Sequence, residues 1–299
     1  MNASASAPPS AARAWALAIR PKTLPAGAVP VLVGTALAAA AGHFAAGPAA
    51  AALVVALLVQ VGTNLANDYY DFKKGADNED RLGPARATQQ GWISPNQVLA
   101  ATGLVLLLAF AIGMYLTWVA GWPALIIGLV SIFFAVAYTG GPFPLAYHGL
   151  GDLFVLIFFG FVATAGTFYV QAMSVNPAVF LAAAPVGLIA TAILVVNNLR
   201  DRHTDAAANK RTLAVRFGER AARIEYTVLI AVAYLAPIVA VLTGWGGLGW
   251  LLPLVSLPLA ARNIRAIWTT DGAALNPYLG ATAKLEMVFG ILLSVGVLL

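Results

Sequence analysis

Residues 178–205 read AVFLAAAPVGLIATAILVVNNLRDRHTD. Residues 178–197 carry no charged side chain, and a helix of that length crosses the hydrocarbon core of a bilayer, which is about 30 Å thick. Charged residues begin at Arg200, directly after the apolar run. The stretch therefore predicts a transmembrane helix that ends in a polar and acidic segment.

The sequence contains eight further apolar runs of similar length. The predicted spans cover residues 24–42, 46–68, 97–119, 121–139, 150–171, 178–197, 224–243, 246–264 and 279–299. The composition agrees, because 61% of the 299 residues are hydrophobic and 10% are charged, whereas a soluble domain has about 25% charged residues. We therefore predict an all-α, polytopic integral membrane protein with nine transmembrane helices.

The positions of Lys and Arg predict the orientation. With nine spans, all 17 basic residues fall on the side of the N-terminus, so the positive-inside rule places that terminus in the cytoplasm. The twelve acidic residues are assigned to the same side, five of them between Asp68 and Asp80. The rule does not require acids to lie inside, so their concentration there calls for a chemical explanation.

The remaining features of the composition exclude other classes of protein. The sequence has no cysteine, which excludes a disulfide framework, a thiolate metal site and a cysteine nucleophile. The topology of the basic residues accounts for the net charge of +5, so no nucleic-acid partner is expected. Residues 1–14 are rich in Ala, Ser and Pro and are predicted to be a disordered tail, followed by one transmembrane domain over 15–299.

The first acidic motif lies at the cytoplasmic end of the second span. Residues 64–77 read NLANDYYDFKKGAD, in which Asn64, Asn67, Asp68 and Asp71 have the spacing of one helical face. Gly75 offers a helix stop, after which Asp77 is expected to fold back towards that face. Lys73 is a candidate phosphate contact or a topology signal.

The second acidic motif ends the sixth span. Residues 197–212 read NNLRDRHTDAAANKRT, where Asn197, Asp201 and Asp205 are four residues apart and Asn198 reaches the same face. Each motif thus places Asn and then paired Asp after an apolar span, followed by Lys or Arg. The loops 69–96 and 198–223 are therefore predicted to form an active site.

Clustered carboxylates repel one another unless a cation joins them. Magnesium fits, because it binds through one or two carboxylates together with substrate phosphates. Basic side chains would neutralise the remaining phosphate charge. The predicted catalytic residues are Asp68, Asp71, Asp201 and Asp205; the predicted metal ligands are these four and Asp77; and the predicted phosphate contacts are Arg81, Arg86, Lys210 and Arg211.

These motifs resemble the UbiA superfamily of intramembrane aromatic prenyltransferases, and the resemblance covers nearly the whole chain. Several stretches resemble its menaquinone branch, the 1,4-dihydroxy-2-naphthoate polyprenyltransferases: 20–25, 64–69, 75–77, 80–84, 197–201 and 210–216. The 4-hydroxybenzoate branch usually has a Tyr-x-x-x-Lys element, and the corresponding Tyr138-Thr-Gly-Gly-Pro142 has no lysine. This departure favours the naphthoate branch and leaves the lysine role open to Lys22 or Lys210.

The resemblance implies a Mg²⁺-dependent transfer of a polyprenyl group from a long allylic diphosphate to an aromatic hydroxy-acid. The product would be demethylmenaquinol, formed with loss of carbon dioxide and diphosphate in a bacterial inner membrane, with the active site on the cytoplasmic side. Tyr138, Phe159 and Tyr169 are candidates to stabilise the allylic cation, and Arg20 or Lys22 to meet the acceptor carboxylate. The apolar tail would lie between helices and reach membrane lipid.

Two alternatives remain open. Another aromatic acceptor, such as 4-hydroxybenzoate, homogentisate or a porphyrin, is compatible with the same acidic motifs. A membrane transporter is the alternative from a different class, but it is expected to carry ionisable groups near the middle of its spans. The sequence assigns its charges to one rim instead.

Overall fold

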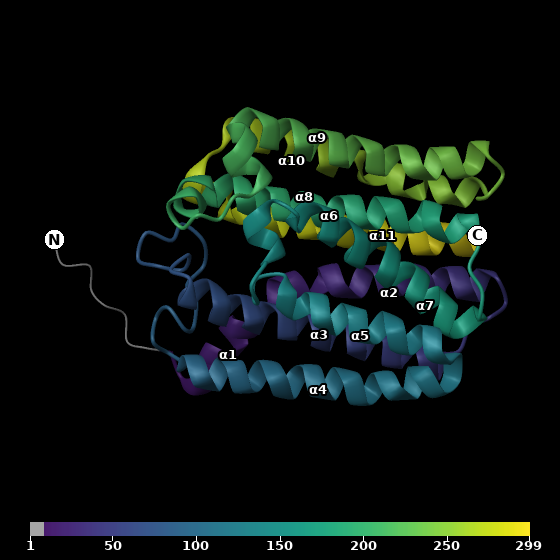
Figure 1. Cartoon of the computed structure of the whole chain (residues 1–299). Coiled ribbons are helices and arrows are strands. Elements are labelled where there is room, and N and C mark those ends of the chain that lie inside the picture. The colour runs from purple at the N-terminus through teal and green to yellow at the C-terminus, as the bar shows by residue number, and fades with distance from the viewer. Residues whose placement is uncertain (1–8) are drawn as a thin grey trace.

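The computed structural model describes residues 9–299, which form helices and connecting loops with no strand (Figure 1). The elements in chain order are α1 Ala11–Ile19, η1 Pro21–Thr23, α2 Leu24–Ala40, α3 Ala46–Lys73, α4 Pro95–Ala120, α5 Trp122–Ala137, η2 Leu145–His148, α6 Gly151–Val155, η3 Leu156–Val162, α7 Ala163–Ala172, α8 Pro177–Ala207, α9 Leu213–Leu242, η4 Leu248–Ser256, α10 Leu257–Thr269, η5 Gly272–Leu275 and α11 Asn276–Leu298. The prediction of an all-α, multi-pass membrane protein is confirmed.

Each predicted span coincides with a helical segment. Within residues 9–299, seven helical segments are long and apolar enough to cross a membrane, and α5 is a shorter apolar helix. The region of the eighth predicted span is divided between the 3₁₀ helix η4, which contains Pro253, and the α-helix α10. The number of crossings and the orientation of the N-terminus stay predictions.

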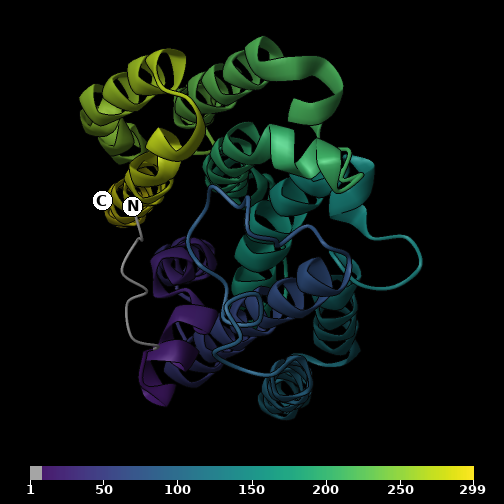
Figure 2. The same ribbon diagram turned by 90° about the vertical axis from the view of Figure 1, so that its left-hand side faces the viewer.

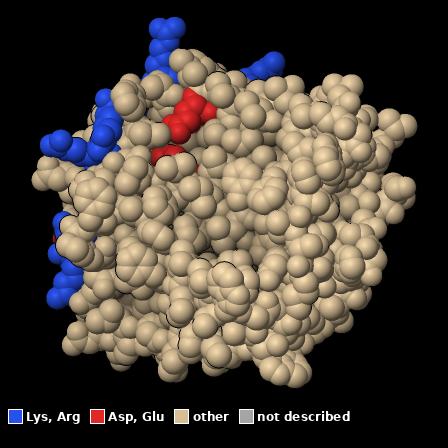
Figure 3. Space-filling model, turned by 45° about the vertical axis from the view of Figure 1, so that its right-hand side comes forward, with Lys and Arg blue, Asp and Glu red and all other residues tan. Residues whose placement is uncertain are grey.

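The charged loops gather at one end of the bundle. The connections α3–α4, α5–α6, α8–α9 and α10–α11 all lie at the left of Figure 1, together with α1. The face in Figure 3 carries its Lys and Arg at the upper and left margins, shows a small group of Asp or Glu atoms in its upper left part, and is otherwise free of charged side chains. One acid departs from the expected one-sided pattern: Glu286 lies midway along α11 and is buried, with no hydrogen-bond partner for either carboxyl oxygen within residues 9–299.

Helix α8 is the centre of the fold. Its residues Val186, Ile189 and Val196 are fully buried in a core that also contains Phe289 of α11 and Tyr226 of α9. Viewed end-on from the charged side, the other helices surround α8 and α3, and the α3–α4 connection crosses in front of them (Figure 2). The two helices that carry the acidic motifs are therefore held firmly on their apolar sides.

The N-terminal segment differs from the expected tail. Residues 1–8 lie outside the described residues, but Ala11 begins α1, and the Ser10 hydroxyl accepts a hydrogen bond from the Arg13 backbone N–H. Ala14 and Ala18 are buried against a cluster that includes Leu65 of α3. The prediction of a tail extending to residue 14 is therefore wrong for its last turn, because small apolar residues on one face pack against α3.

A π-helical segment, η3, joins α6 to α7 beside α8. Such segments occur frequently at functional sites. Here Gly160 and Gly187 allow the backbones to approach closely, since a Cβ atom on Gly160 would lie 2.8 Å from the Gly187 Cα. This contact holds η3 closely against α8.

Candidate active site

A cavity of about 370 Å³ runs from the charged end into the bundle. It is bounded by α2, α3, α4, α5, the α6–α7 segment and α8. At the charged end it is polar, and deeper it is lined by aromatic and aliphatic side chains such as Phe134, Phe154 and Phe158. The predicted site residues that line it are Arg20, Asn64, Asn67, Asp71, Arg86, Tyr138, Asn198 and Lys210.

Lys210 links Asp71 of α3 to Asp205 of α8. The Lys210 Nζ lies 3.9 Å from Asp71 Oδ2 and 3.6 Å from Asp205 Oδ1. Burial acts to lower the pKa of Lys210, but the carboxylates of Asp71 and Asp205 outweigh it and raise this pKa above its ordinary value. The structure thus brings the two acidic motifs together around a positive charge.

A tyrosine completes this group. The Tyr147 hydroxyl donates a 2.9 Å hydrogen bond to Asp71 Oδ1, and the Lys74 Nζ lies 4.6 Å from the centre of the Tyr147 ring. Burial and the Asp71 charge raise the pKa of Tyr147, which keeps the phenol protonated. Tyr147 therefore holds one oxygen of Asp71 in place and leaves the other towards Lys210.

The carboxylate oxygens of Asp71 and Asp205 suit a divalent cation. Asp205 Oδ2 is buried and has no hydrogen-bond partner within residues 9–299, and a magnesium site of this kind uses few carboxylates plus phosphate oxygens. In the described part of the chain, no three acidic or histidine side chains form a ready-made metal cluster. The residues therefore fit a metal that is completed by the diphosphate.

Asp68 faces the α3–α4 connection instead of the cavity. Its carboxylate accepts hydrogen bonds from the backbone N–H groups of Ala87 (3.2 Å) and Thr88 (3.3 Å). Ala87 and Thr88 are themselves buried. Asp68 thus fixes the segment that follows Arg86, and the expected single face of the first motif divides into Asp68 on one side and Asn64, Asn67 and Asp71 on the other.

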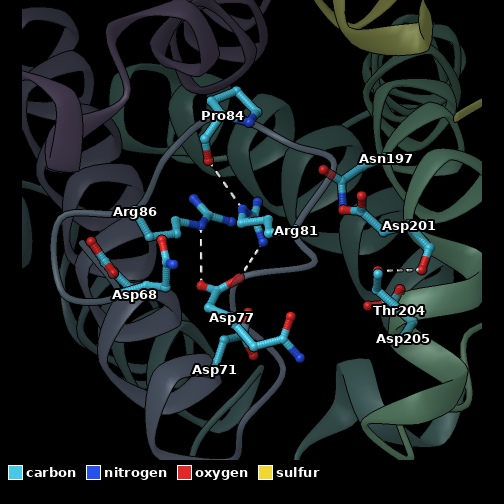
Figure 4. A network of polar contacts seen from close by, with 12 residues as sticks. Asp68, Asp71, Asp77, Arg81, Pro84, Arg86, Asn197, Asp201, Thr204 and Asp205 are labelled. Atoms are coloured by element: carbon cyan, nitrogen blue, oxygen red, sulfur yellow. Dashed lines mark hydrogen bonds and ion pairs between the residues drawn. The ribbon is translucent and has the colours of Figure 1, made fainter. Parts of the chain in front are cut away.

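Asp77 and two arginines form an ion-pair cluster in the same loop. Asp77 pairs with Arg81, and its Oδ2 lies 3.2 Å from the Arg86 Nε (Figure 4). The Arg81 Nε also donates to the Pro84 carbonyl oxygen at 3.0 Å. Burial and the neighbouring Arg81 lower the pKa of Arg86, while Asp77 opposes them. The loop therefore holds Arg86 at the cavity by charge pairing.

Arg200 links the second motif to that loop. This fully buried guanidinium bonds both oxygens of Asp201, and it donates to Asn197 Oδ1 at 2.7 Å and Asn276 Oδ1 at 2.9 Å. Asn276 in turn donates to the Leu82 carbonyl oxygen at 2.9 Å. The second motif is thus tied to α11 and to the α3–α4 connection.

The close packing over Arg200 explains a glycine in the loop. A Cβ atom at position 83 would lie 2.6 Å from Arg200 Nη2. Only a residue without a side chain lets the backbone pass this close. Gly83 therefore allows the α3–α4 connection to pack directly against Arg200.

Several predicted residues are not brought to the cavity. Lys22, Lys73 and Arg211 are exposed and do not line it. The Tyr169 hydroxyl donates to the Ala120 carbonyl oxygen at the opposite end of the bundle, whereas Phe159 does line the cavity. Of the two residues proposed for the acceptor carboxylate, only Arg20 is at the cavity.

Sequence reasoning assigned no role to Tyr147, Asn276 or Asp152, and it considered Arg200 only as a basic residue of the loop. Tyr147 and Asp152 lie in the stretch YHGLGD, 147–152, and a short polar stretch between two apolar spans is the signal available in the sequence. Asn276 has no such signal, because its contact with Leu82 depends on two segments separated by 194 residues.

This chain is similar to known proteins over most of its length. The model of the UbiA prenyltransferase family matches residues 27–283. A 1,4-dihydroxy-2-naphthoate octaprenyltransferase of Escherichia coli K12 is 39% identical over 298 residues, covering 97% of this chain and 96% of that protein. The protein of the same name from Bacillus subtilis 168 is 32% identical over 287 residues, covering 95% and 92%.

Solved structures share the fold. A UbiA homologue from Archaeoglobus fulgidus bound to DMAPP and Mg²⁺ has a TM-score of 0.64 at 14% identity, with 94% of this chain and 99% of that chain covered. The apo structure of a UbiA homologue from Aeropyrum pernix K1 has a TM-score of 0.69 at 16% identity, with 93% and 96% covered. From the family match and the full-length relatives, this chain is a member of the UbiA prenyltransferase family.

Proposed function

We propose that the protein transfers a polyprenyl group from an allylic diphosphate to 1,4-dihydroxy-2-naphthoate, with loss of carbon dioxide and diphosphate, to give demethylmenaquinol. The observation that carries the proposal is one continuous cavity with an acidic and basic mouth and an aromatic, apolar interior. A substrate with a charged head and a long hydrocarbon tail matches both ends. The naphthoate acceptor is supported by the names of the full-length relatives.

The mouth of the cavity would hold the diphosphate. Arg86 and Lys210 line it and would neutralise phosphate oxygens, with Arg81 supporting Arg86 through Asp77. Asp71 and Asp205 would hold Mg²⁺, which when bound stabilises the negative charge of the departing diphosphate. The other three predicted ligands, Asp68, Asp77 and Asp201, already bind backbone N–H groups or arginines, and we propose that they shape the site.

The interior would protect the allylic cation. Phe134, Phe154 and Phe158 form an aromatic group, with the Phe134 and Phe154 ring centres 4.8 Å apart, and all three line the cavity. Aromatic faces attract a cation, and an interior without water prevents its capture before the acceptor attacks. Tyr138 lines the cavity between this group and the charged mouth.

Product analysis tests the proposed function. The purified protein, supplied with octaprenyl diphosphate, Mg²⁺ and the naphthoate, is expected to give a prenylated naphthoquinol that lacks the mass of the carboxyl group in mass spectrometry. Parallel reactions with 4-hydroxybenzoate and homogentisate serve as controls. Turnover of one of these acceptors without turnover of the naphthoate would contradict the assigned acceptor.

The deep part of the cavity is expected to hold the prenyl tail. Gly166 of α7 lines it, and the nearest side-chain atom to a Cβ built there is 3.7 Å away on Ile127. Gly166→Phe should fill this space and lower kcat/KM for octaprenyl diphosphate at least about tenfold, while geranyl diphosphate is used within about threefold of the wild-type rate. The matched control is Gly103→Phe, which points from α4 into open space. Equal losses for the short and long substrates would place the tail elsewhere.

The active site is proposed to face the cytoplasm of a bacterial inner membrane. The absence of cysteine allows a direct test with single-cysteine variants. Glu79 is exposed at the charged end and Phe44 is exposed at the opposite end. A maleimide that cannot cross membranes is expected to label Phe44→Cys in cells whose outer membrane has been permeabilised, and Glu79→Cys only after the inner membrane is broken. The reverse pattern would invert the topology.

A further inference from the structure

Asp152 lies at the cavity without a role in binding diphosphate or metal. It is the second residue of the short helix α6 and is 6% exposed. It lines the cavity, and its Oδ1 atom is buried with no hydrogen-bond partner within residues 9–299. A buried, unpartnered carboxyl oxygen destabilises the fold, so its presence beside a substrate cavity points to a ligand that supplies a donor.

The position of Asp152 is defined by its neighbours. The Thr191 hydroxyl of α8 is 3.4 Å from the Asp152 carbonyl oxygen, and a Cβ atom on Gly151 would lie 2.9 Å from the Tyr138 hydroxyl. Tyr138 follows α5, and the next residue, Thr139, donates to Asn67 Oδ1 on α3 at 2.8 Å. Asn67 is one helical turn, about 6 Å, from Asp71 along α3. These contacts place Asp152 near the mouth of the cavity, close to where the prenyl C1 atom would separate from the diphosphate.

A second unpartnered oxygen lines the cavity but lies deeper. Gln60 Oε1 is also buried without a hydrogen-bond partner within the described residues. Gln60 precedes Asp71 by eleven residues of α3, which corresponds to about 16 Å. Its side chain also has amide donors, whereas an ionised Asp152 has only acceptors. Of the two, Asp152 is the one that suits a hydroxyl group close to the reacting carbon.

We propose that Asp152 is a catalytic residue that binds the acceptor's ring hydroxyl and acts as its general base. The inference rests on the proposed prenyl transfer to a dihydroxy aromatic acid. The Asp152 carboxylate accepts a hydrogen bond from the hydroxyl next to the carboxylated carbon. As that carbon attacks prenyl C1, the O–H proton passes to Asp152, and the O–H electron pair forms the carbonyl bond.

The remaining bonds balance. The electron pair of the bond between prenyl C1 and the diphosphate oxygen leaves with diphosphate. A π electron pair of the ring forms the new C–C bond. Loss of carbon dioxide then returns the pair of the C–COO⁻ bond to the ring. The proton on Asp152 returns to the ring oxygen, which restores the quinol and the carboxylate. General-base assistance of this kind contributes about 10²–10⁴-fold.

The test compares Asp152→Asn with the wild-type full-length protein in nanodiscs. Asparagine keeps the size and a hydrogen-bond acceptor but not the base. We expect kcat/KM for the naphthoate to fall at least about 100-fold, while the Mg²⁺-dependent affinity for an unreactive prenyl thiolodiphosphate stays within about twofold. Glu79→Gln, at an exposed acid of the α3–α4 connection, is the matched control and should leave both values unchanged.

A second measurement changes the acceptor and compares the two proteins. The naphthoate with a methyl ether in place of the hydroxyl next to its carboxylate cannot donate to Asp152, so the wild-type protein should use it at least about 100-fold less well than the parent acid. Asp152→Asn should discriminate less than about threefold between the two acceptors. Use of the ether by the wild type at the rate of the parent acid, or near-wild-type activity of Asp152→Asn, would overturn the inference. Wild-type product from the parent acid establishes the proposed function whichever of these results is found.

Discussion

Asp205→Ala is expected to lower kcat/KM for the prenyl diphosphate by about 10³-fold or more. Asp205 Oδ2 has no partner within residues 9–299, and its other oxygen lies 3.6 Å from Lys210, which lines the cavity, so a bound metal ion would give this carboxylate the partner that Oδ2 lacks. Removing one preorganised group that stabilises a developing anion costs about 10²–10³-fold, and the loss of a metal ligand adds to this cost. Steady-state rates at saturating naphthoate and several Mg²⁺ concentrations measure the effect.

Asp71→Ala is expected to have an effect of similar size, and the two substitutions together should cost little more than either alone. Residues that act as one unit are strongly non-additive. The exposed Glu79 provides the control, since Glu79→Ala should change the rate less than about twofold. Full additivity of the two losses would mean that Asp71 and Asp205 do not serve one common complex.

Arg200→Met is expected to lower the free energy of unfolding by about 3–5 kcal/mol, because it leaves the Asp201 charge buried without its partner. Arg200 is fully buried and carries the contacts to Asp201, Asn197 and Asn276. Thermal unfolding in detergent, in the absence of substrate, measures the loss. Asn276→Ala should destabilise less, by about 1–2 kcal/mol, since it removes neutral hydrogen bonds at both ends of the link.

A double substitution separates the charge from the packing. Arg200→Met with Asp201→Asn removes both charges, and we expect the pair to be more stable than Arg200→Met alone. Arg202→Met is the control, because Arg202 pairs with Glu219 and Asp271 at a more exposed place on the same helix. A loss for Arg202→Met as large as that for Arg200→Met would show that burial of the pair is not the cause.

The sequence was informative wherever a local pattern determines the outcome. Apolar length predicted the helical segments, and the placement of Lys and Arg predicted which loops meet at one end. Asn64, Asn67 and Asp71, at i, i+3 and i+7 of α3, lie together at the cavity as their helical spacing predicts. These features depend on residues close in sequence, so helix geometry alone is sufficient to predict them.

Features that depend on the loop conformation could not be predicted. Asp68 has the spacing of a cavity residue, yet backbone N–H groups 19 and 20 residues later bind its carboxylate. The pairing of Asp77 with Arg81 and Arg86 likewise requires the folded path of the α3–α4 connection. Glu286 was assigned to the charged rim with its neighbour Lys284, but the helix carries it to the buried side of α11, whereas Lys284 is exposed.

The central claim is that Asp71 and Asp205 hold the prenyl diphosphate through a divalent cation, and binding measures this without the chemistry. Calorimetric titration of the protein in nanodiscs with geranyl thiolodiphosphate is the direct measurement. With Mg²⁺ the wild type should bind at least about tenfold more tightly than with EDTA, a difference of about 1.4 kcal/mol or more, and Asp205→Ala should lose this difference. Equal affinity of the wild type with Mg²⁺ and with EDTA would contradict the account.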